Sequence, residues 1–173
     1  MPSDMIIRVK CDPYLVRFAV ALYGNMPINF PKNSNFLNIL DVFLDKPPMD
    51  FKQPDYGKET LWIQLPYFEN KNILYNNYLS PLKQRIFVKE LNKYFKITFR
   101  SEVSKHILNG LEKKDSLALF IEKYNLSQDS WDFLDKDFQR YLTIKRKRRL
   151  FRNRKNTSVN ALLCPKDYAR TTK

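Results

Sequence analysis

A run of basic residues near the end of the chain limits what the rest can fold into. Between Lys145 and Lys155, eight of eleven residues are Lys or Arg and none is Asp or Glu. Such a run cannot enter an apolar core, because each buried charge would lose its hydration. It carries +8 of the chain's formal charge of +13, and residues 156–173 carry +2. The folded body therefore has to come from residues 1–144, whose net charge is only +3.

The composition is that of a folded protein. Hydrophobic residues make up 43% and aromatic residues 14% of the 173 residues, which is too much for a disordered polymer. No apolar run approaches the ~18 residues of a membrane span, and residues 1–4 do not resemble a secretion signal. Cys11 and Cys164 lie at opposite ends of the chain, so we expect free thiols and a cytoplasmic protein.

The N-terminal residues predict alternating strands and short helices. Residues 5–11 alternate in hydrophobicity and predict a strand, and Asp12-Pro13 predicts the start of a helix that Gly24 ends. Ser34 or Asn35 is expected to cap a second helix that ends at Pro47-Pro48. Residues 60–65 have the strongest strand pattern in the chain.

The remaining residues predict helices. Ser80-Pro81 predicts the start of a long helix, and Ile97-Thr98-Phe99 predicts a break, after which Ser101 caps the next segment. Gly110 marks a turn. We therefore expect an α+β, predominantly helical fold. It comprises a small α+β lobe (1–79), a helical helix-turn-helix-like region (80–144), and a basic arm with a tail (145–173).

Two helices joined by a short turn are predicted between Asp115 and Tyr141. Asn125 stands where the turn needs a left-handed residue, Ser127 can cap the second helix, and that helix is expected to start at Gln128. Ile121 replaces the small residue usual in a helix-turn-helix, and the second helix is acidic, which suits DNA poorly. A plain pair of packed helices, without DNA contact, fits the same pattern. The apolar positions expected to pack the pair are Phe120, Tyr124, Leu126, Trp131 and Leu134.

The stretches Phe120 to Ser127 and Phe138-Gln139-Arg140-Tyr141 resemble parts of small helix-turn-helix-like, DNA-associated proteins. Mobile elements and phages of Bacteroides-type bacteria encode such proteins. The resemblance implies an accessory or regulatory role and assigns no catalytic residue.

Apolar residues keep helical spacing up to Lys145, so the basic arm is expected to continue the last helix. Lys145, Arg149 and Arg152 would then share a face. Nucleic acid is the favoured partner, DNA over RNA, because a polycation gains affinity by neutralising phosphates. A solubilising tail or a contact with an acidic protein surface are the alternatives, and no membrane contact is expected. The expected nucleic-acid-binding residues are Lys136, Arg140, Lys145, Arg146, Lys147, Arg148, Arg149, Arg152, Arg154 and Lys155, with Gln128 and Ser130 at most positioning the protein.

Enzyme signatures are few, and we expect no catalytic residue, metal or cofactor. His106 is the only histidine and is interpreted as structural. Pro54-Asp55 followed by Glu69-Asn70-Lys71 superficially fits the metal site of restriction-type nucleases, which leaves a metal-dependent nuclease as a remote alternative. A further alternative is a structural component of a phage particle or nucleoprotein complex that docks through its aromatic-rich body. Such a component would lie within a virion.

Overall fold

The computed structural model describes residues 5–52, 54 and 56–162, and the side chains of all of these except 151–162. The chain forms two units, Met1–Trp131, here called the body, and Asp132–Lys173, here called the arm unit. The predicted boundary between the α+β lobe and the helical region, at 79/80, lies inside the body. The division of the chain into three parts stays a prediction. The described residues are mainly helical with one two-stranded antiparallel sheet, which confirms a predominantly helical α+β fold.

The sheet pairs two strands that are about fifty residues apart in the sequence. Strand β1 (Ile6–Lys10) lies antiparallel to β2 (Thr60–Gln64), with Val9 opposite Leu61 and Ile7 opposite Ile63. These four side chains are buried on one face, while the Arg8 guanidinium lies 4.9 Å from the Trp62 ring centroid. Both predicted strands are confirmed, because alternating hydrophobicity places one row of side chains in the core.

Helix α1 (Pro13–Tyr23) begins and ends where the sequence predicted. Pro13 occupies the first turn, although the Asp12 side chain makes no capping hydrogen bond. Gly24 ends the helix with φ +95°, and its N–H donates to the Val20 carbonyl.

Helix α2 (Asn35–Phe43) starts at the predicted cap but ends early. Ser34 Oγ accepts a hydrogen bond from the Leu37 N–H at 3.2 Å. The expectation that Pro47-Pro48 end this helix is wrong, because the chain is already extended at Leu44. Burial of Leu44 in the core outweighs continuation of the helix to the prolines.

Helix α3 (Pro81–Leu108) runs through the predicted break at residues 97–99 without interruption. Ser80 caps it as expected, accepting a hydrogen bond from the Lys83 N–H. The break is absent because β-branched residues cost a helix only a few tenths of a kcal/mol, whereas each buried aromatic residue stabilises it by much more. One buried residue in every four forms the inner face: Phe87, Leu91, Phe95, Phe99 and Val103.

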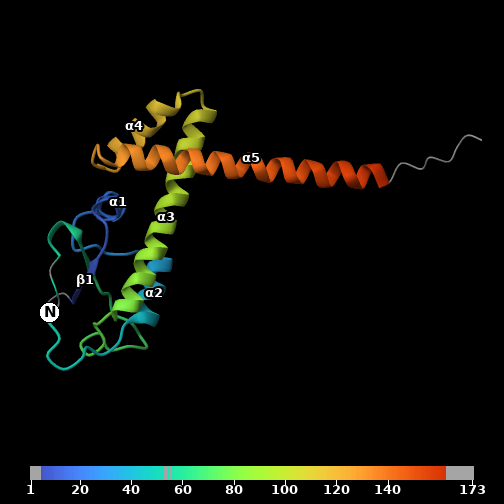
Figure 1. Ribbon diagram of the computed structural model, residues 1–173. Helices are drawn as coiled ribbons and strands as arrows, with labels where there is room; N and C mark the ends of the chain where they lie inside the picture. The colour runs from blue at the N-terminus through green and yellow to red at the C-terminus, as the bar shows by residue number, and fades with distance from the viewer. Residues whose placement is uncertain (1–4, 53, 55, 163–173) are drawn as a thin grey trace, which may run out of the picture. The chain divides into compact units, whose positions relative to one another are not determined.

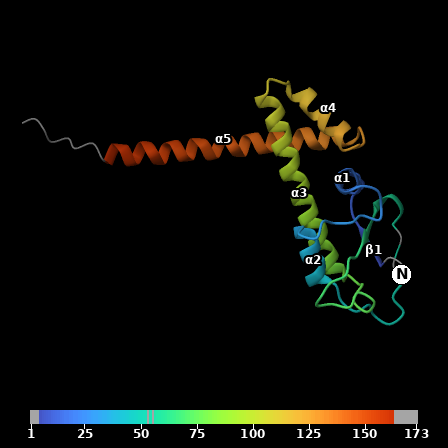
Figure 2. The same cartoon turned by 180° about the vertical axis from the view of Figure 1, so that it is seen from behind.

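The core of the body is built on α3. Figure 1 and Figure 2, seen from opposite sides, both show α2 beside the first half of this helix. The Phe18 ring of α1 meets Phe95 of α3 edge to face at 5.0 Å between centroids. Phe99 of α3 meets Phe120 of α4 (Lys113–Lys123) at 5.0 Å. Aromatic side chains from three helices therefore fill one core.

Both α3 and α4 end in the same hydrogen-bonded turn. After α4, Asn125 adopts φ +47°, its N–H donates to the Glu122 carbonyl, and the Leu126 N–H donates to the Ile121 carbonyl. Gly110 has φ +93° in the equivalent position after α3. This is the Schellman arrangement, which needs one left-handed residue. The turns predicted at Gly110 and Asn125 are confirmed.

The last helix, α5 (Ser130–Leu162), is continuous through the basic arm, as the sequence predicted. It begins two residues later than expected, because Gln128 and Asp129 form a turn. At about 1.5 Å per residue its 33 residues span about 50 Å. None of the helices in the described part of the chain has the length and hydropathy that a membrane crossing requires.

Candidate nucleic-acid interface

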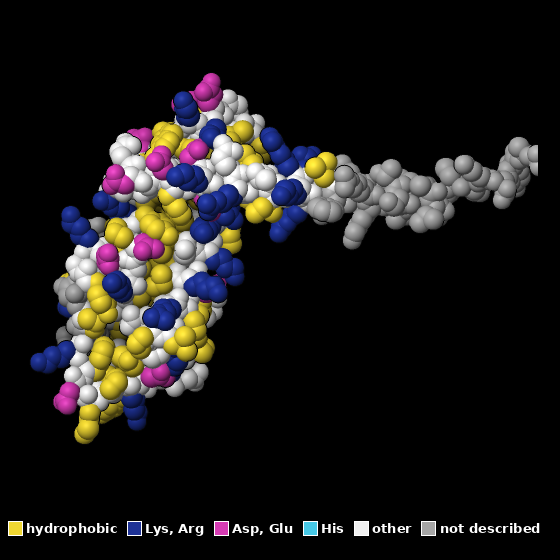
Figure 3. All heavy atoms as spheres, viewed as in Figure 1, with side chains coloured by type: hydrophobic (Ala, Val, Ile, Leu, Met, Phe, Trp, Pro, Cys, Tyr) yellow, Lys and Arg dark blue, Asp and Glu magenta, His cyan; other side chains and the backbone are white. Residues whose placement is uncertain are grey.

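The basic side chains that the structure describes in the arm unit lie on α5 and face solvent. All six residues from Lys145 to Leu150 are exposed, and so are Lys136 and Arg140. Figure 3 shows dark blue Lys and Arg side chains around the described part of this helix. The backbone of Arg152, Arg154 and Lys155 belongs to α5, but their side chains lie outside the described part of the chain.

Helical geometry distributes these cations around the axis. Lys145 and Arg149 are four residues apart and share one face, as expected, with position 152 one turn further on. Lys136 and Arg140 do not share that face, because the five residues from Arg140 to Lys145 rotate the helix by about 140°. They lie in line with Lys147 instead. The basic residues therefore project on more than one side of the helix.

Acidic and basic residues are separated along the arm unit. Asp132, Asp135 and Asp137 lie in the first turns of α5, and no Asp or Glu occurs from Phe138 to Leu162. Asp137 is only 7% exposed. Negative charge near a helix N-terminus is favourable, since the peptide dipoles make that end partly positive. The exposed cations described on α5 from Arg140 to Arg149 are therefore separated along the helix from Asp132 and Asp135.

Short-range contacts order the base of the cationic stretch. The Lys145 ammonium lies 5.7 Å from the Tyr141 ring centroid, and Tyr141 lies 5.9 Å from the Phe138 ring. Thr143 Oγ1 donates to the Gln139 carbonyl at 3.0 Å.

Two further residues, Gln128 and Ser130, were expected to position the protein on a partner. Gln128 is exposed, whereas Ser130 is buried and its hydroxyl lies 3.2 Å from that of Ser127.

The body has a second cationic surface that the sequence analysis missed. Basic residues recur every three or four positions along α3, which places them on one side of the helix. Figure 3 shows Lys and Arg side chains among apolar ones on the visible face of the body. The spacing was a usable signal, but the denser run at 145–155 dominated the charge pattern. This surface, here called the α3 cationic face, consists of Arg85, Lys89, Lys93, Lys96 and Arg100. The side chains of Arg85, Lys89 and Lys93 are exposed.

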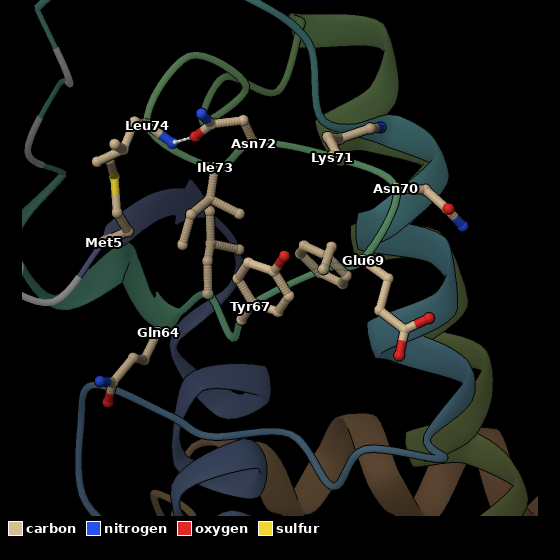
Figure 4. A pocket seen from close by; sticks show the side chains of 11 residues that line it. Met5, Gln64, Tyr67, Glu69, Asn70, Lys71, Asn72, Ile73 and Leu74 are labelled. Carbon is tan, nitrogen blue, oxygen red and sulfur yellow. Dashed lines mark hydrogen bonds between the residues drawn. The ribbon is translucent and has the colours of Figure 1, made fainter.

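Two residues of the nuclease-like pattern, Glu69 and Lys71, line one cavity, but the Lys71 ammonium is bound elsewhere. Lys71 donates from its ammonium to the carbonyls of Asp41 and Leu44 at the end of α2. Glu69 is exposed in the loop after β2, and Asp55 lies outside the described residues. Figure 4 shows the side chain of Lys71, one of the residues that line a cavity of about 650 Å³ with Met5, Ile73 and Leu74, directed toward α2. Lys71 therefore caps a helix in this arrangement.

Titratable groups with shifted pKa values lie inside the body. Burial, followed by the charges of Asp12 and Glu59, raises the pKa of the Cys11 thiol to about 12. Burial and a hydrogen bond to Glu102 raise the pKa of Tyr124 to about 12. Among the described residues no three His, Cys, Asp or Glu side chains gather as metal ligands.

Comparison with protein-family models, with curated proteins and with solved structures finds no match for this chain.

Proposed function

We propose that this protein is a non-enzymatic accessory or regulatory protein that binds nucleic acid, duplex DNA in the first place. The observation that carries the proposal is a continuous helix, α5, with exposed Lys145–Arg149 side chains and no acidic residue between Phe138 and its end at Leu162. Each cation that neutralises a phosphate releases a counterion, and this release favours binding. The expected affinity is therefore mainly electrostatic.

The distribution of charge around α5 favours insertion into a groove over binding along one strand. A helix lying on one strand can use one face, whereas Lys145 and Lys147 project from different sides of α5. The major groove of duplex DNA admits an α-helix and has a phosphate strand on each side. Residues 145–155 span about 16 Å, which is enough to reach both strands.

Sequence preference is expected to be low. Phosphate contacts position a protein without reading bases, and the residues proposed to bind are almost all Lys and Arg. The helix-turn-helix-like segment contributes position rather than base recognition in this proposal. Its support is the left-handed Asn125 and the turn that it closes before α5. The acidic first turns of α5 point against base contacts there.

A salt titration of duplex binding tests the proposal. The five residues from Lys145 to Arg149 are replaced by Gln, which preserves helix propensity. The slope of log affinity against log salt should fall by up to about 4.5, at about 0.9 per lost phosphate contact. An unchanged slope would refute the role of the arm. A matched control replaces five exposed body lysines by Gln and should keep the slope: Lys32, Lys46, Lys52, Lys58 and Lys105.

A structural component of a larger assembly is the second candidate. Three large side chains near the cavity of Figure 4 are strongly exposed: Tyr67 at 81%, Tyr75 at 63% and Leu74 at 56%. Clustered exposed apolar residues are typical of protein-binding surfaces. Purification after nuclease treatment separates the two candidates. A stoichiometric protein that stays bound favours assembly, whereas loss of all partners favours direct nucleic-acid binding.

A further inference from the structure

A second cavity of the body lies against the α3 cationic face. It has a volume of about 400 Å³ and lies between the end of α1, the start of α2 and the middle of α3. Aromatic side chains from these three helices line it, namely Tyr23, Phe36 and Tyr94. Polar side chains also line it, including Asn35, Glu90 and Lys93.

The aromatic lining is preorganised. The Phe36 and Tyr94 rings pack at 5.6 Å between centroids and 80° between planes, and Tyr23 packs against Phe36 at 6.5 Å. Tyr94 also contacts Phe18 of the core at 6.1 Å. Although these contacts hold the ring, Tyr94 remains 40% exposed. A flat apolar ligand can therefore stack on this cluster without rearrangement of the core.

The positive charge of the side chains next to the cavity favours a ligand that carries negative charge. Lys93 belongs both to the cavity lining and to the α3 cationic face, where its ammonium lies 3.3 Å from the Glu90 carboxylate. Lys89 is exposed one turn before it, and Lys96 and Arg100 continue the same side of α3. The three positions from Lys89 to Lys96 extend over about 10 Å of helix.

We propose that this cavity binds an unstacked base of single-stranded nucleic acid, with the adjoining phosphates on the α3 cationic face. Single-strand binding sites combine these two features, a cationic track for phosphates and aromatic rings on which bases stack. A base in a duplex is stacked and paired, so it cannot enter the cavity without leaving the helix. Glu90 and Asn35 supply hydrogen-bonding groups for the base edge. The inference takes its polymer class from the proposed function but does not use the arm.

Binding of a fluorescently labelled single strand and of its duplex to full-length protein tests the proposal. The charge-reversed variant Lys89→Glu/Lys93→Glu should bind the single strand at least about tenfold more weakly and change duplex affinity much less. The matched control, Lys46→Glu/Lys58→Glu, makes the same change of charge at exposed positions outside the cavity lining. This control should leave the difference between single-strand affinity and duplex affinity unchanged.

The aromatic contact has its own test. Tyr94→Leu should weaken single-strand binding by about tenfold, whereas Tyr94→Phe, which keeps the ring, should bind normally. Thermal unfolding of each variant reports whether the fold is intact. Because Lys89 and Lys93 are exposed, the variant Lys89→Glu/Lys93→Glu tests the site even if Tyr94→Leu does not fold.

The outcomes separate this inference from the proposed function. If the unmodified protein binds neither polymer, both proposals fail. If it binds duplex through the arm while the α3 variants bind single strands normally, only the cavity proposal fails. It also fails if single-strand and duplex affinity fall equally. Polyglutamate is the probe for an unspecific anionic partner. If it competes as well as the single strand, and Tyr94→Leu has no effect, the surface is a general anion site and the proposal is overturned.

Discussion

Tyr124 and Glu102 join the end of α4 to α3 by a hydrogen bond inside the body. The Tyr124 hydroxyl donates to Glu102 Oε1 at 2.8 Å, and the Lys123 ammonium donates to the same oxygen at 2.8 Å. Tyr124 is 2% exposed, and its ring lies 5.0 Å from Phe18 and 4.6 Å from Phe120. One side chain therefore couples the aromatic core to a carboxylate and precedes the left-handed turn at Asn125.

Removal of the hydroxyl should destabilise the body. Tyr124→Phe keeps the ring but removes a hydrogen bond to a charged group and leaves Lys123 as the remaining donor to Glu102 Oε1, so the free energy of unfolding should fall by about 2 kcal/mol. Urea denaturation measures this change. Tyr75→Phe, at a side chain that is 63% exposed, should have no measurable effect. A loss below about 0.5 kcal/mol for Tyr124→Phe would show that the hydrogen bond contributes little.

Stability should fall at alkaline pH through Cys11. Its pKa rises from the ordinary 9.0 to about 12 in the folded protein, so the folded state holds the proton more tightly than the unfolded state. The stabilisation is complete below pH 9 and is lost as pH rises toward 12. Between pH 9 and 10 the free energy of unfolding should drop by about 1 kcal/mol.

The variant Cys11→Ala should lose most of the drop between pH 9 and 10, whatever its overall stability, because Tyr23 and Tyr124, whose ordinary pKa is 10.0, contribute less in this range. Tyr124→Phe is a suitable comparison, because the ordinary pKa of that tyrosine is 10.0 and most of its own contribution is lost above pH 10. Denaturant titrations at several pH values measure both variants. A drop of equal size in Cys11→Ala would contradict the assignment to the thiol.

The left-handed turn before α5 should depend on residue 125. Asn125 has φ +47°, a conformation that costs most residues about 1–2 kcal/mol and glycine almost nothing. Asn125→Gly should therefore be tolerated and Asn125→Ala should destabilise the protein by about 1 kcal/mol. At Asn38, an exposed position in α2, the Ala substitution should be neutral or slightly stabilising. Thermal melting of the three variants measures these effects. If Asn125→Ala and Asn38→Ala change the melting temperature equally, the left-handed turn does not contribute to stability.

Lys71 should stabilise the end of α2. Its ammonium donates to two carbonyls that lack partners within the helix, and such charged hydrogen bonds contribute about 2 kcal/mol. Lys71→Met retains most of the apolar stem and removes both bonds, so its urea midpoint should be lower. Lys46→Met, at an exposed lysine, provides the comparison. Identical midpoints would rule out a capping role.

Duplex binding should depend on the helical continuity of α5 as well as on its charge. Leu150→Pro interrupts the helix within the basic stretch without altering any Lys or Arg, because proline removes a hydrogen-bond donor and clashes with the preceding turn. We expect lower helix content by circular dichroism and weaker duplex binding. Leu150→Ala, at a side chain that is 62% exposed, should preserve both. Equal affinity of the two variants would mean that the arm binds as a flexible polycation.

Local signals predicted where most elements begin and end. Ser34, Ser80 and Pro13 start helices because a capping oxygen or a proline acts within the first turn. Gly24 and Asn125 end them because their backbones accept positive φ. The end of α2 could not be predicted in this way, since burial of Leu44 and the capping by Lys71 depend on residues distant in the sequence.

By itself the sequence determined the cationic character of residues 145–155 and the helix that carries them, because charge and helical periodicity are local properties. Only the tertiary structure decided that α3 continues past residue 97, since Phe95 and Phe99 are buried by partners on α1 and α4. It also decided which side of α3 remains outside. Once Phe87 and Leu91 enter the core, the rigid helix places Lys89 and Lys93 in solvent beside the aromatic cavity, a juxtaposition of three helices that no single stretch of sequence contains.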